Sequence, residues 1–295
     1  MCVLFTSLRP LDRAENIKAV YDAYDGEKQF VQRKRWEQIE DLHSGKYRLL
    51  VADELPGDTP GKCLFIGHGM GAIKTYGLDM PRPFFEHPEY VTYAIASSRD
   101  MIPIVANQIG ISESQVIPLG MPRTDAYFGE VTYEDHLYAP TFRPGGWMPD
   151  LNLMWRLMPN GMKLTVKLHP VTGNKVTSVW QNIEVASAWE ISTPYLQRAK
   201  TVITDYSSIM FDAMVLRKPV ILFAQDREEY LAERGIYYKY PDCYSKRYCE
   251  REEHLIGFMQ TAVWTDFDEE RREFFTGACD GHSVERTIEL IRSML

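Results

Sequence analysis

Residues 204–212 (TDYSSIMFD) have the residue types of an anion-binding turn. A predicted strand runs into Ser207 and Ser208, and a predicted helix follows at once. Unpaired amides at a helix N-terminus, with hydroxyl groups beside them, bind anions. Asp212 lies one turn into that helix, where its carboxylate could accept hydrogen bonds from ribose hydroxyls. A plain helix cap formed by Asp205 or Ser207 explains the same pattern, so both interpretations stay open.

The segment 164–170 (LTVKLHP) places a cation and an imidazole at the end of a strand. Strand alternation puts Lys167 and His169 on one face, and Pro170 ends the strand. In an open α/β sheet, ligands bind outside the carboxyl ends of the strands. These two side chains suit a pyrophosphate, although a histidine before proline is also a common hydrogen-bonded turn residue.

A glycine-rich turn, residues 67–74 (GHGMGAIK), directly follows another predicted strand. Glycines on both sides of His68 allow close approach of a ligand and leave the imidazole unobstructed. This is a reasonable setting for a general base. The spacing to Lys74 fits neither a Walker loop nor a dinucleotide-binding fingerprint. A structural histidine in a glycine turn is the competing interpretation.

Two further turns carry an arginine after a predicted strand, at 120–125 (GMPRTD) and 138–143 (YAPTFR). A guanidinium group matches a phosphate well, so Arg123 and Arg143 are candidate ligand contacts. Either arginine could equally be an exposed ion-pair partner.

The sequence predicts no metal site and no cofactor. Asp266 and Asp268 look like a DxD metal motif, but they lie in an acidic run that opens a predicted helix. The five cysteines are scattered and lack zinc-type spacing, which favours reduced thiols in the cytoplasm.

These segments must be positioned by alternating strands and helices, which predict parallel sheets with crossover helices. The predicted strands are 3–7, 47–52, 63–66, 91–96 and 115–118, then 136–139, 163–167, 182–185, 201–203 and 220–223. The predicted helices are 12–24, 28–43 and 98–110, then 151–157, 207–216 and 282–295. The pattern indicates two α/β lobes of about five strands each.

We therefore expect a GT-B-like fold with two Rossmann-like lobes, parallel sheets and an active-site cleft between the lobes. Residues 1–128 are the expected acceptor lobe and 129–295 the nucleotide-donor lobe, with the last helix free to pack back on the first lobe. The net charge of −8 argues against nucleic acid as a partner and against broad contact with anionic lipid. No apolar run is long enough to span a bilayer, and the N-terminus lacks a basic leader.

Five motifs, in order, resemble the CDP-glycerol glycerophosphotransferase family of teichoic acid synthesis: HGMGAIK, LGMPRTD, YAPTFR, KLHP and TDYSSIMFDAMVLRKPVILF. The resemblance covers roughly residues 63–225, and the form of the first motif is more similar to the primase-type members. The residue before His68 is Gly67 instead of the usual aromatic residue, and the chain is short for the family. These departures bear on a lipid acceptor more than on the donor.

The resemblance implies roles for particular residues. His68 corresponds to the family's proposed catalytic base and His169 to its second essential histidine. Arg143, Lys167, Ser207 and Ser208 fall on positions associated with the donor's pyrophosphate, and Asp212 on the acidic position near the ribose. Arg123 matches a family arginine of less definite role.

The implied function is transfer of glycerol phosphate from CDP-glycerol, or a related CDP-alditol, to a hydroxyl group of a glycan. The implied acceptor is a glycan or an undecaprenyl-diphosphate-linked disaccharide, in synthesis of a teichoic-acid-type or capsule polymer. The enzyme would be cytoplasmic, with at most weak peripheral contact at the inner face of the membrane. The alternatives are a GT-B glycosyltransferase that uses a sugar nucleotide and a non-catalytic nucleotide-binding protein.

Overall fold

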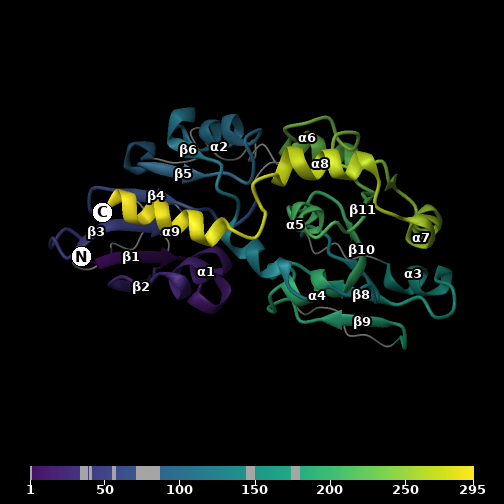
Figure 1. The fold of residues 1–295 in the computed structure, drawn as a ribbon. Coiled ribbons are helices and arrows are strands. Elements are labelled where there is room, and N and C mark those ends of the chain that lie inside the picture. Colours follow the sequence, from purple (N-terminus) through teal and green to yellow (C-terminus); the bar gives the residue numbers. More distant parts are fainter. Residues whose placement is uncertain are drawn as a thin grey trace. The chain divides into compact units, whose positions relative to one another are not determined.

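A computed structural model describes residues 2–33, 39, 42–54, 58–70, 87–143, 150–173 and 180–295 of the chain (Figure 1). It divides into two compact units: the described residues up to 128 together with 273–295, and residues 129–272. The prediction of two α/β lobes built on parallel sheets is confirmed, since every pairing in the two sheets is parallel.

The first unit has a sheet in the order β2-β1-β3-β4-β5-β6. Its strands are β1 (Cys2–Ser7), β2 (Lys28–Gln32), β3 (Tyr47–Ala52), β4 (Cys63–Phe65), β5 (Tyr93–Ile95) and β6 (Val116–Ile117). Its helices are α1 (Glu15–Ala23), α2 (Ile102–Ile109) and α9 (Ser283–Met294), with short 3-10 turns η1 (Leu11–Arg13), η2 (Pro88–Tyr90), η3 (Glu113–Gln115) and η4 (Pro122–Phe128). β1 is buried throughout, as expected of a parallel strand covered on both faces.

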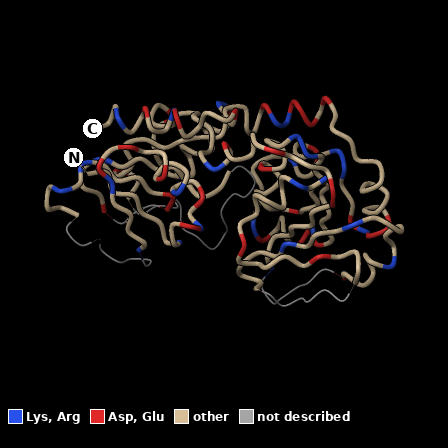
Figure 2. The backbone as a smooth tube through the Cα atoms, turned by 60° about the horizontal axis from the view of Figure 1, so that its bottom comes forward, with Lys and Arg blue, Asp and Glu red and all other residues tan. Residues whose placement is uncertain are grey.

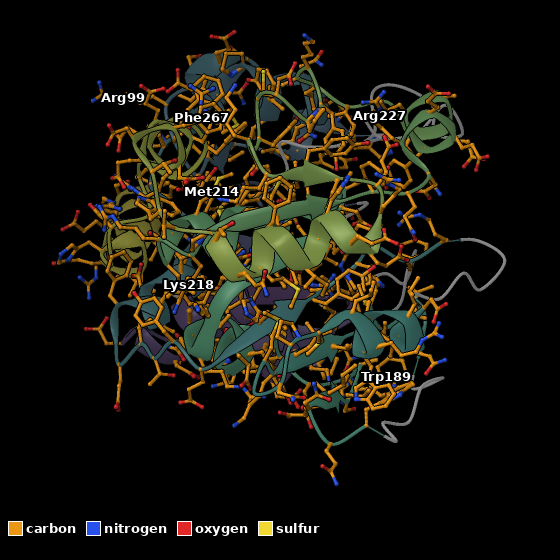
Figure 3. All side chains as sticks on the ribbon, turned by 90° about the vertical axis from the view of Figure 1, so that its right-hand side faces the viewer. Arg99, Trp189, Met214, Lys218, Arg227 and Phe267 are labelled. Carbon is orange, nitrogen blue, oxygen red and sulfur yellow. The ribbon has the colours of Figure 1, made fainter. Side chains whose placement is uncertain are left out.

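The second unit has a sheet in the order β12-β11-β10-β7-β8-β9. Its strands are β7 (Asp135–Tyr138), β8 (Leu164–Lys167), β9 (Ile183–Ala186), β10 (Ala199–Thr204), β11 (Val220–Phe223) and β12 (Tyr248–Cys249). Its helices are α3 (Leu151–Leu157), α4 (Thr193–Arg198), α5 (Ile209–Val215), α6 (Arg227–Arg234) and α7 (Glu252–Thr261); α8 (Asp266–Thr276) begins in this unit. α5 packs on β10 and β11 with Met214 buried, and the fully buried Lys218 follows it (Figure 3).

One predicted element is wrong. A helix was expected over residues 28–43, but Lys28–Gln32 forms β2, which pairs in parallel with β1 from Val3↔Lys28 to Ser7↔Gln32. Phe30 and Val31 favour a strand, and backbone pairing with β1 overrides the helix-forming residues around them. With β2 and the two-residue strand β12, each sheet has six strands.

Basic and acidic residues are interspersed along the backbone of each unit (Figure 2). None of the helices in the described ranges is long and apolar enough to cross a membrane.

Candidate functional site

The first unit places His68 in a turn after β4, beside two acidic residues that follow β3. β3 and β4 are parallel neighbours, so their carboxyl ends lie at the same edge of the sheet. Gly67 adopts a φ of 60°, a left-handed conformation that favours glycine. Glu54 Oε1 lies 3.2 Å from His68 Nδ1, and the side chain of His68 is 38% exposed. His68 can therefore reach a ligand while one ring nitrogen contacts a carboxylate. The remainder of its motif, Gly71 to Lys74, lies outside the described residues.

The surroundings keep the His68 imidazole neutral near pH 7. Desolvation lowers the pKa of His68 below its ordinary value, and the positive charges of Arg9 and Arg123 act in the same direction. The charge of Glu54 opposes them but does not outweigh them. A neutral imidazole is the form that a general base needs.

Arg123 holds the backbone of the His68 turn. Its Nη1 donates to the His68 carbonyl oxygen at 2.9 Å, and the side chain is buried. Asn16, from α1, accepts from the Arg123 backbone N–H and donates to the Gly67 carbonyl oxygen, both at 2.9 Å. Asn16 therefore links the glycine turn to the arginine turn. The sequence did not single out Asn16, and a polar residue in the first turn of a helix carries no local signal of such a link.

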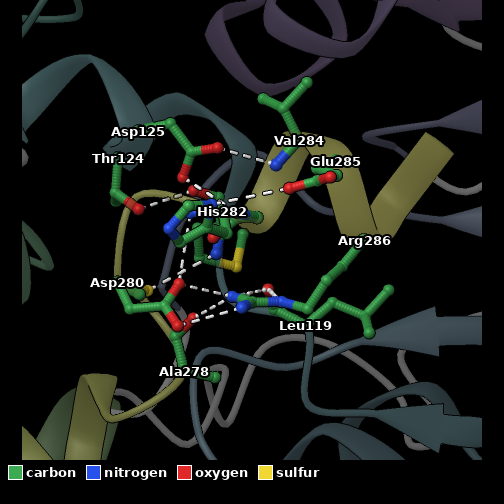
Figure 4. A network of polar contacts seen from close by, with 12 residues as sticks. Leu119, Thr124, Asp125, Ala278, Asp280, His282, Val284, Glu285 and Arg286 are labelled. Carbon is green, nitrogen blue, oxygen red and sulfur yellow. Dashed lines mark hydrogen bonds and ion pairs between the residues drawn. The ribbon is translucent and has the colours of Figure 1, made fainter. Parts of the chain in front are cut away.

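The rest of the LGMPRTD motif anchors the C-terminal segment within the first unit (Figure 4). Asp125 accepts from the backbone N–H groups of Ser283 and Val284, at 3.0 and 2.7 Å, and so caps the N-terminus of α9. The guanidinium of Arg286 donates to the Leu119 carbonyl oxygen at 3.1 and 2.9 Å. A Cβ atom on Gly120 would lie 2.3 Å from the Ala278 carbonyl oxygen. These residues therefore serve the fold.

In the second unit, Asp205 joins two of the sequence motifs. Its Oδ1 accepts from the backbone N–H groups of Thr141 and Tyr206, at 2.8 and 2.6 Å. Its Oδ2 accepts from Arg143 Nη2 at 2.9 Å. The ends of β7 and β10 are thus fixed to each other by one buried carboxylate. These contacts join two motif turns, whereas the role considered for Asp205 from sequence was a cap of the following helix.

Arg143 is paired with carboxylates of its own unit. Asp226 accepts from its Nε at 2.6 Å and from its Nη2 at 3.0 Å, and the Thr141 carbonyl oxygen accepts from its Nη1 at 2.7 Å. Its guanidinium carbon lies 5.1 Å from the Tyr206 ring centroid and 4.9 Å from that of Tyr230. The side chain is 9% exposed.

The electrostatics of Arg143 follow from these contacts. Burial alone would lower the pKa of Arg143, but hydrogen bonding to Asp226 and the charges of Asp205 and Asp226 outweigh it and raise the pKa. The contact of Arg143 with a pyrophosphate stays a prediction. The structure shows in addition that Arg143 pairs with Asp205 and Asp226. The sequence did not single out Asp226, because 83 residues separate it from Arg143.

Lys167 and His169 lie at the end of β8 but differ in exposure. Lys167 is 5% exposed, and its Nζ donates to the carbonyl oxygens of Ser187 and Ala188, both at 3.3 Å. His169 is exposed, and its Nδ1 accepts from the Val171 backbone N–H at 3.2 Å. The hydrogen-bond pattern therefore assigns the proton of the neutral ring to Nε2, which can donate to a phosphate oxygen. The centroid of the His169 ring lies 4.9 Å from the centroid of the Phe142 ring.

The two serines before α5 are half-buried. Ser207 Oγ accepts from the Ile209 backbone N–H at a long 3.4 Å, and Ser208 is the N-cap residue without a side-chain cap bond. Asp212 lies in the first turn of α5 and is 5% exposed. The structure therefore supports a weak cap at Ser207. The predicted contacts of these three residues with the donor stay predictions.

The DxD-like pair has a structural partner. Asp268 accepts from Arg247 Nη1 at 2.9 Å and from Nη2 at 2.6 Å, and also from the Thr265 backbone N–H at 2.9 Å. This buried pair links β12 to α8. No group of three or more His, Cys, Asp or Glu side chains that could hold a metal ion occurs in the part of the chain that the structure describes.

Comparisons with known proteins agree with the motif pattern. A family model described as CDP-glycerol:poly(glycerophosphate) glycerophosphotransferase matches residues 27–293. A teichoic acid poly(ribitol-phosphate) polymerase of Bacillus spizizenii is 26% identical over 260 residues, which cover 76% of this chain and 42% of the polymerase. A teichoic acid glycerol-phosphate primase of Bacillus subtilis is 26% identical over 272 residues, which cover 79% of this chain and 68% of the primase. The chain thus spans less than half of that polymerase and about two thirds of that primase.

Solved structures with the same fold include two functional classes. The wall teichoic acid polymerase TagF gives a TM-score of 0.79 at 17% identity, over 99% of this chain and 88% of that chain. A UDP-GlcNAc 2-epimerase of Neisseria meningitidis bound to UDP-GlcNAc gives a TM-score of 0.57 at 13% identity. The match covers 99% of this chain and 100% of the epimerase chain. At these identities the likeness shows the fold alone, which is GT-B-like.

Proposed function

Since this chain belongs to the CDP-glycerol:poly(glycerophosphate) glycerophosphotransferase family, we propose that it transfers glycerol phosphate from CDP-glycerol to a hydroxyl group of a glycan or lipid-linked glycan. The observation that carries the proposal is the family match over residues 27–293, which includes all eight predicted site residues. Because curated relatives include ribitol-phosphate as well as glycerol-phosphate enzymes, a CDP-ribitol donor belongs to the same proposal.

In the proposed reaction His68 takes the proton from the acceptor hydroxyl. The acceptor oxygen then forms a bond to the phosphorus that carries the glycerol, the bond from this phosphorus to the oxygen bridging to CMP breaks, and CMP leaves. Lowering of the His68 pKa by desolvation supports this role, because the imidazole is neutral at the start.

The second unit would bind the donor. His169 Nε2–H and the hydroxyls of Ser207 and Ser208 are the donors we assign to the pyrophosphate, together with Lys167 and Arg143. Fixed donors of this kind stabilise the charge that develops on a leaving group. Asp212 is assigned to the ribose. Arg123 holds the backbone of the His68 turn, and its contact with a ligand stays a prediction.

A sugar-nucleotide donor is the second candidate, because a UDP-GlcNAc-bound epimerase shares the fold. Thermal unfolding with CDP-glycerol, CDP-ribitol and UDP-GlcNAc separates the candidates. A ligand at a hundred times its Kd stabilises the folded state by about 2.7 kcal/mol. We expect a rise in Tm with a CDP-alditol, CMP release when an acceptor is added, and no rise with UDP-GlcNAc. A rise with UDP-GlcNAc and none with either CDP-alditol would contradict the donor assignment.

A further inference from the structure

The backbone that carries His68 is held from two sides within the first unit. Asn16 fixes the Gly67 carbonyl oxygen, and Arg123 fixes the carbonyl oxygen of His68 itself, each at 2.9 Å. Since these contacts fix the main chain, the direction of the imidazole depends on what its ring touches. The recorded contacts of the ring are the Glu54 carboxylate, 3.2 Å from Nδ1, and a hydrogen bond to the Asp53 backbone; of these two, only Glu54 brings a charge to the ring.

The neighbouring acidic residue is unsuited to this task. Asp53 is 1% exposed, and its Oδ2 accepts from Ser7 Oγ at 3.0 Å. Its Oδ1 finds no hydrogen-bond partner among the described residues. Burial raises the pKa of Asp53 to about 6, so this carboxyl is protonated in part at mildly acidic pH. Glu54 is 30% exposed, and its backbone carbonyl oxygen accepts from Arg33 Nη2 at 2.8 Å.

We propose that Glu54 is the positioning residue of His68: its carboxylate orients the imidazole through Nδ1 and stabilises the imidazolium that forms when His68 takes the proton from the acceptor. This inference rests on the proposed function. A carboxylate at Nδ1 favours the tautomer with the proton on Nδ1, which leaves the lone pair on Nε2 as the base.

The charges around His68 determine what loss of Glu54 would do. Arg9 and Arg123 disfavour the imidazolium, whereas Glu54 and a hydrogen bond to the Asp53 backbone favour it. Without the Glu54 charge, less negative charge offsets the effect of the two arginines on the imidazolium. The pKa of His68 should then fall further, and a weaker base accepts the acceptor proton less readily.

The experiment uses Glu54→Gln, which keeps the shape of the side chain, in the chain of residues 1–295. The matched control is Asp58→Asn, because Asp58 Oδ2 contacts His43 Nε2 at 2.6 Å in an exposed pair of the same unit. The His68 resonance is titrated by NMR without ligand. In parallel, CDP-glycerol affinity and the pH profile of kcat are measured with an acceptor.

For Glu54→Gln we expect the His68 titration midpoint and the acidic limb of the kcat profile to move to lower pH. We also expect the plateau of kcat to fall about tenfold or more, with an unchanged Kd for CDP-glycerol. The carboxylate of a catalytic triad contributes up to about 10⁴-fold, and partial exposure weakens the effect here. Asp58→Asn should leave the His68 titration and kcat unchanged.

An unchanged His68 midpoint in Glu54→Gln would overturn the proposal, whatever the activity. If Glu54→Gln does not fold, Glu54→Asp is used, which retains the charge but shortens the side chain by one methylene. In Glu54→Asp, a lowered kcat together with a changed His68 titration midpoint supports the proposal. An unchanged kcat overturns it. Absence of transfer from any CDP-alditol by the unsubstituted protein contradicts the proposed function, while the ligand-free titration still tests the coupling between Glu54 and His68.

Discussion

The two units use their motif arginines differently. In the first unit Arg123 donates to a backbone carbonyl oxygen and leaves the His68 ring partly exposed. In the second unit Arg143 is bound by two carboxylates between two tyrosine rings. The comparison shows that a motif arginine can have a structural role, in which it holds a backbone turn in place. The side chains of His68 and His169 are exposed, whereas those of Arg123 and Arg143 are largely buried and hold the backbone of their motif turns, which does not exclude the proposed contact of Arg143 with the donor.

Arg143→Ala should give the largest loss of stability. It removes the partner of two carboxylates, and breaking a buried ion pair from one side costs about 3–5 kcal/mol. Arg217→Ala is the matched control in the same unit, because Arg217 pairs with Glu269 at 3.1 Å while 56% exposed. That control should cost about 0.2–1 kcal/mol. Denaturant unfolding measures both, and equal losses would show that the Arg143 network is not a buried structural element.

Asp53→Asn should change how stability depends on pH in the first unit. Burial raises the pKa of Asp53 from 3.8 to about 6, so the folded state holds this proton more tightly than the unfolded state. The Asp53 contribution is therefore complete below about pH 4 and lost as the pH rises to about 6, by roughly 1.4 kcal/mol per pH unit, or about 3 kcal/mol in all.

The comparison is made by denaturant unfolding of both proteins from pH 4 to pH 7. Asp53→Asn should lack this loss. The free energy of unfolding of the variant should therefore increase relative to that of the unsubstituted protein as the pH rises. A constant stability difference over this range would show that the Asp53 carboxyl is not strained by burial.

Gly120→Ala should lose about 1–3 kcal/mol from backbone strain alone, and the steric clash of its Cβ atom adds to this loss. The residue combines a φ of 81° with a Cβ position 2.3 Å from the Ala278 carbonyl oxygen. Gly45→Ala is the control, because Gly45 has a φ of 82° and nothing within 4 Å of its Cβ position. Thermal unfolding of the two variants separates backbone conformation from steric clash. Equal losses would mean that the C-terminal segment can move away from Gly120.

Much of the fold could be predicted because local patterns determined it. β3, β11 and α3 occupy the residues expected from periodicity, and Gly110 ends α2 with a φ of 86°. β2 was mistaken for a helix because only pairing with β1 makes Lys28–Gln32 a strand. β12 was missed because two residues carry too little pattern.

The site was predicted as a set of residues, but the contacts among them were not. Asn16 and Arg123 are 107 residues apart, and Asp226 and Arg143 are 83 apart. Such pairs form only when the strands have assembled, so no local spacing reveals them. Glu54 was missed for the same reason, since it follows β3 whereas His68 follows β4.

The most direct test of the account compares donor binding with turnover in His68→Ala. His68 is partly exposed and belongs to the first unit, whereas the proposed donor contacts belong to the second. Calorimetry should therefore give a nearly unchanged Kd for CDP-glycerol, while kcat for CMP release in the presence of an acceptor falls by about 10²–10⁴-fold, the usual contribution of a general base. Loss of CDP-glycerol binding in a folded His68→Ala protein, or retention of full turnover, would contradict the assignment of His68 as the base.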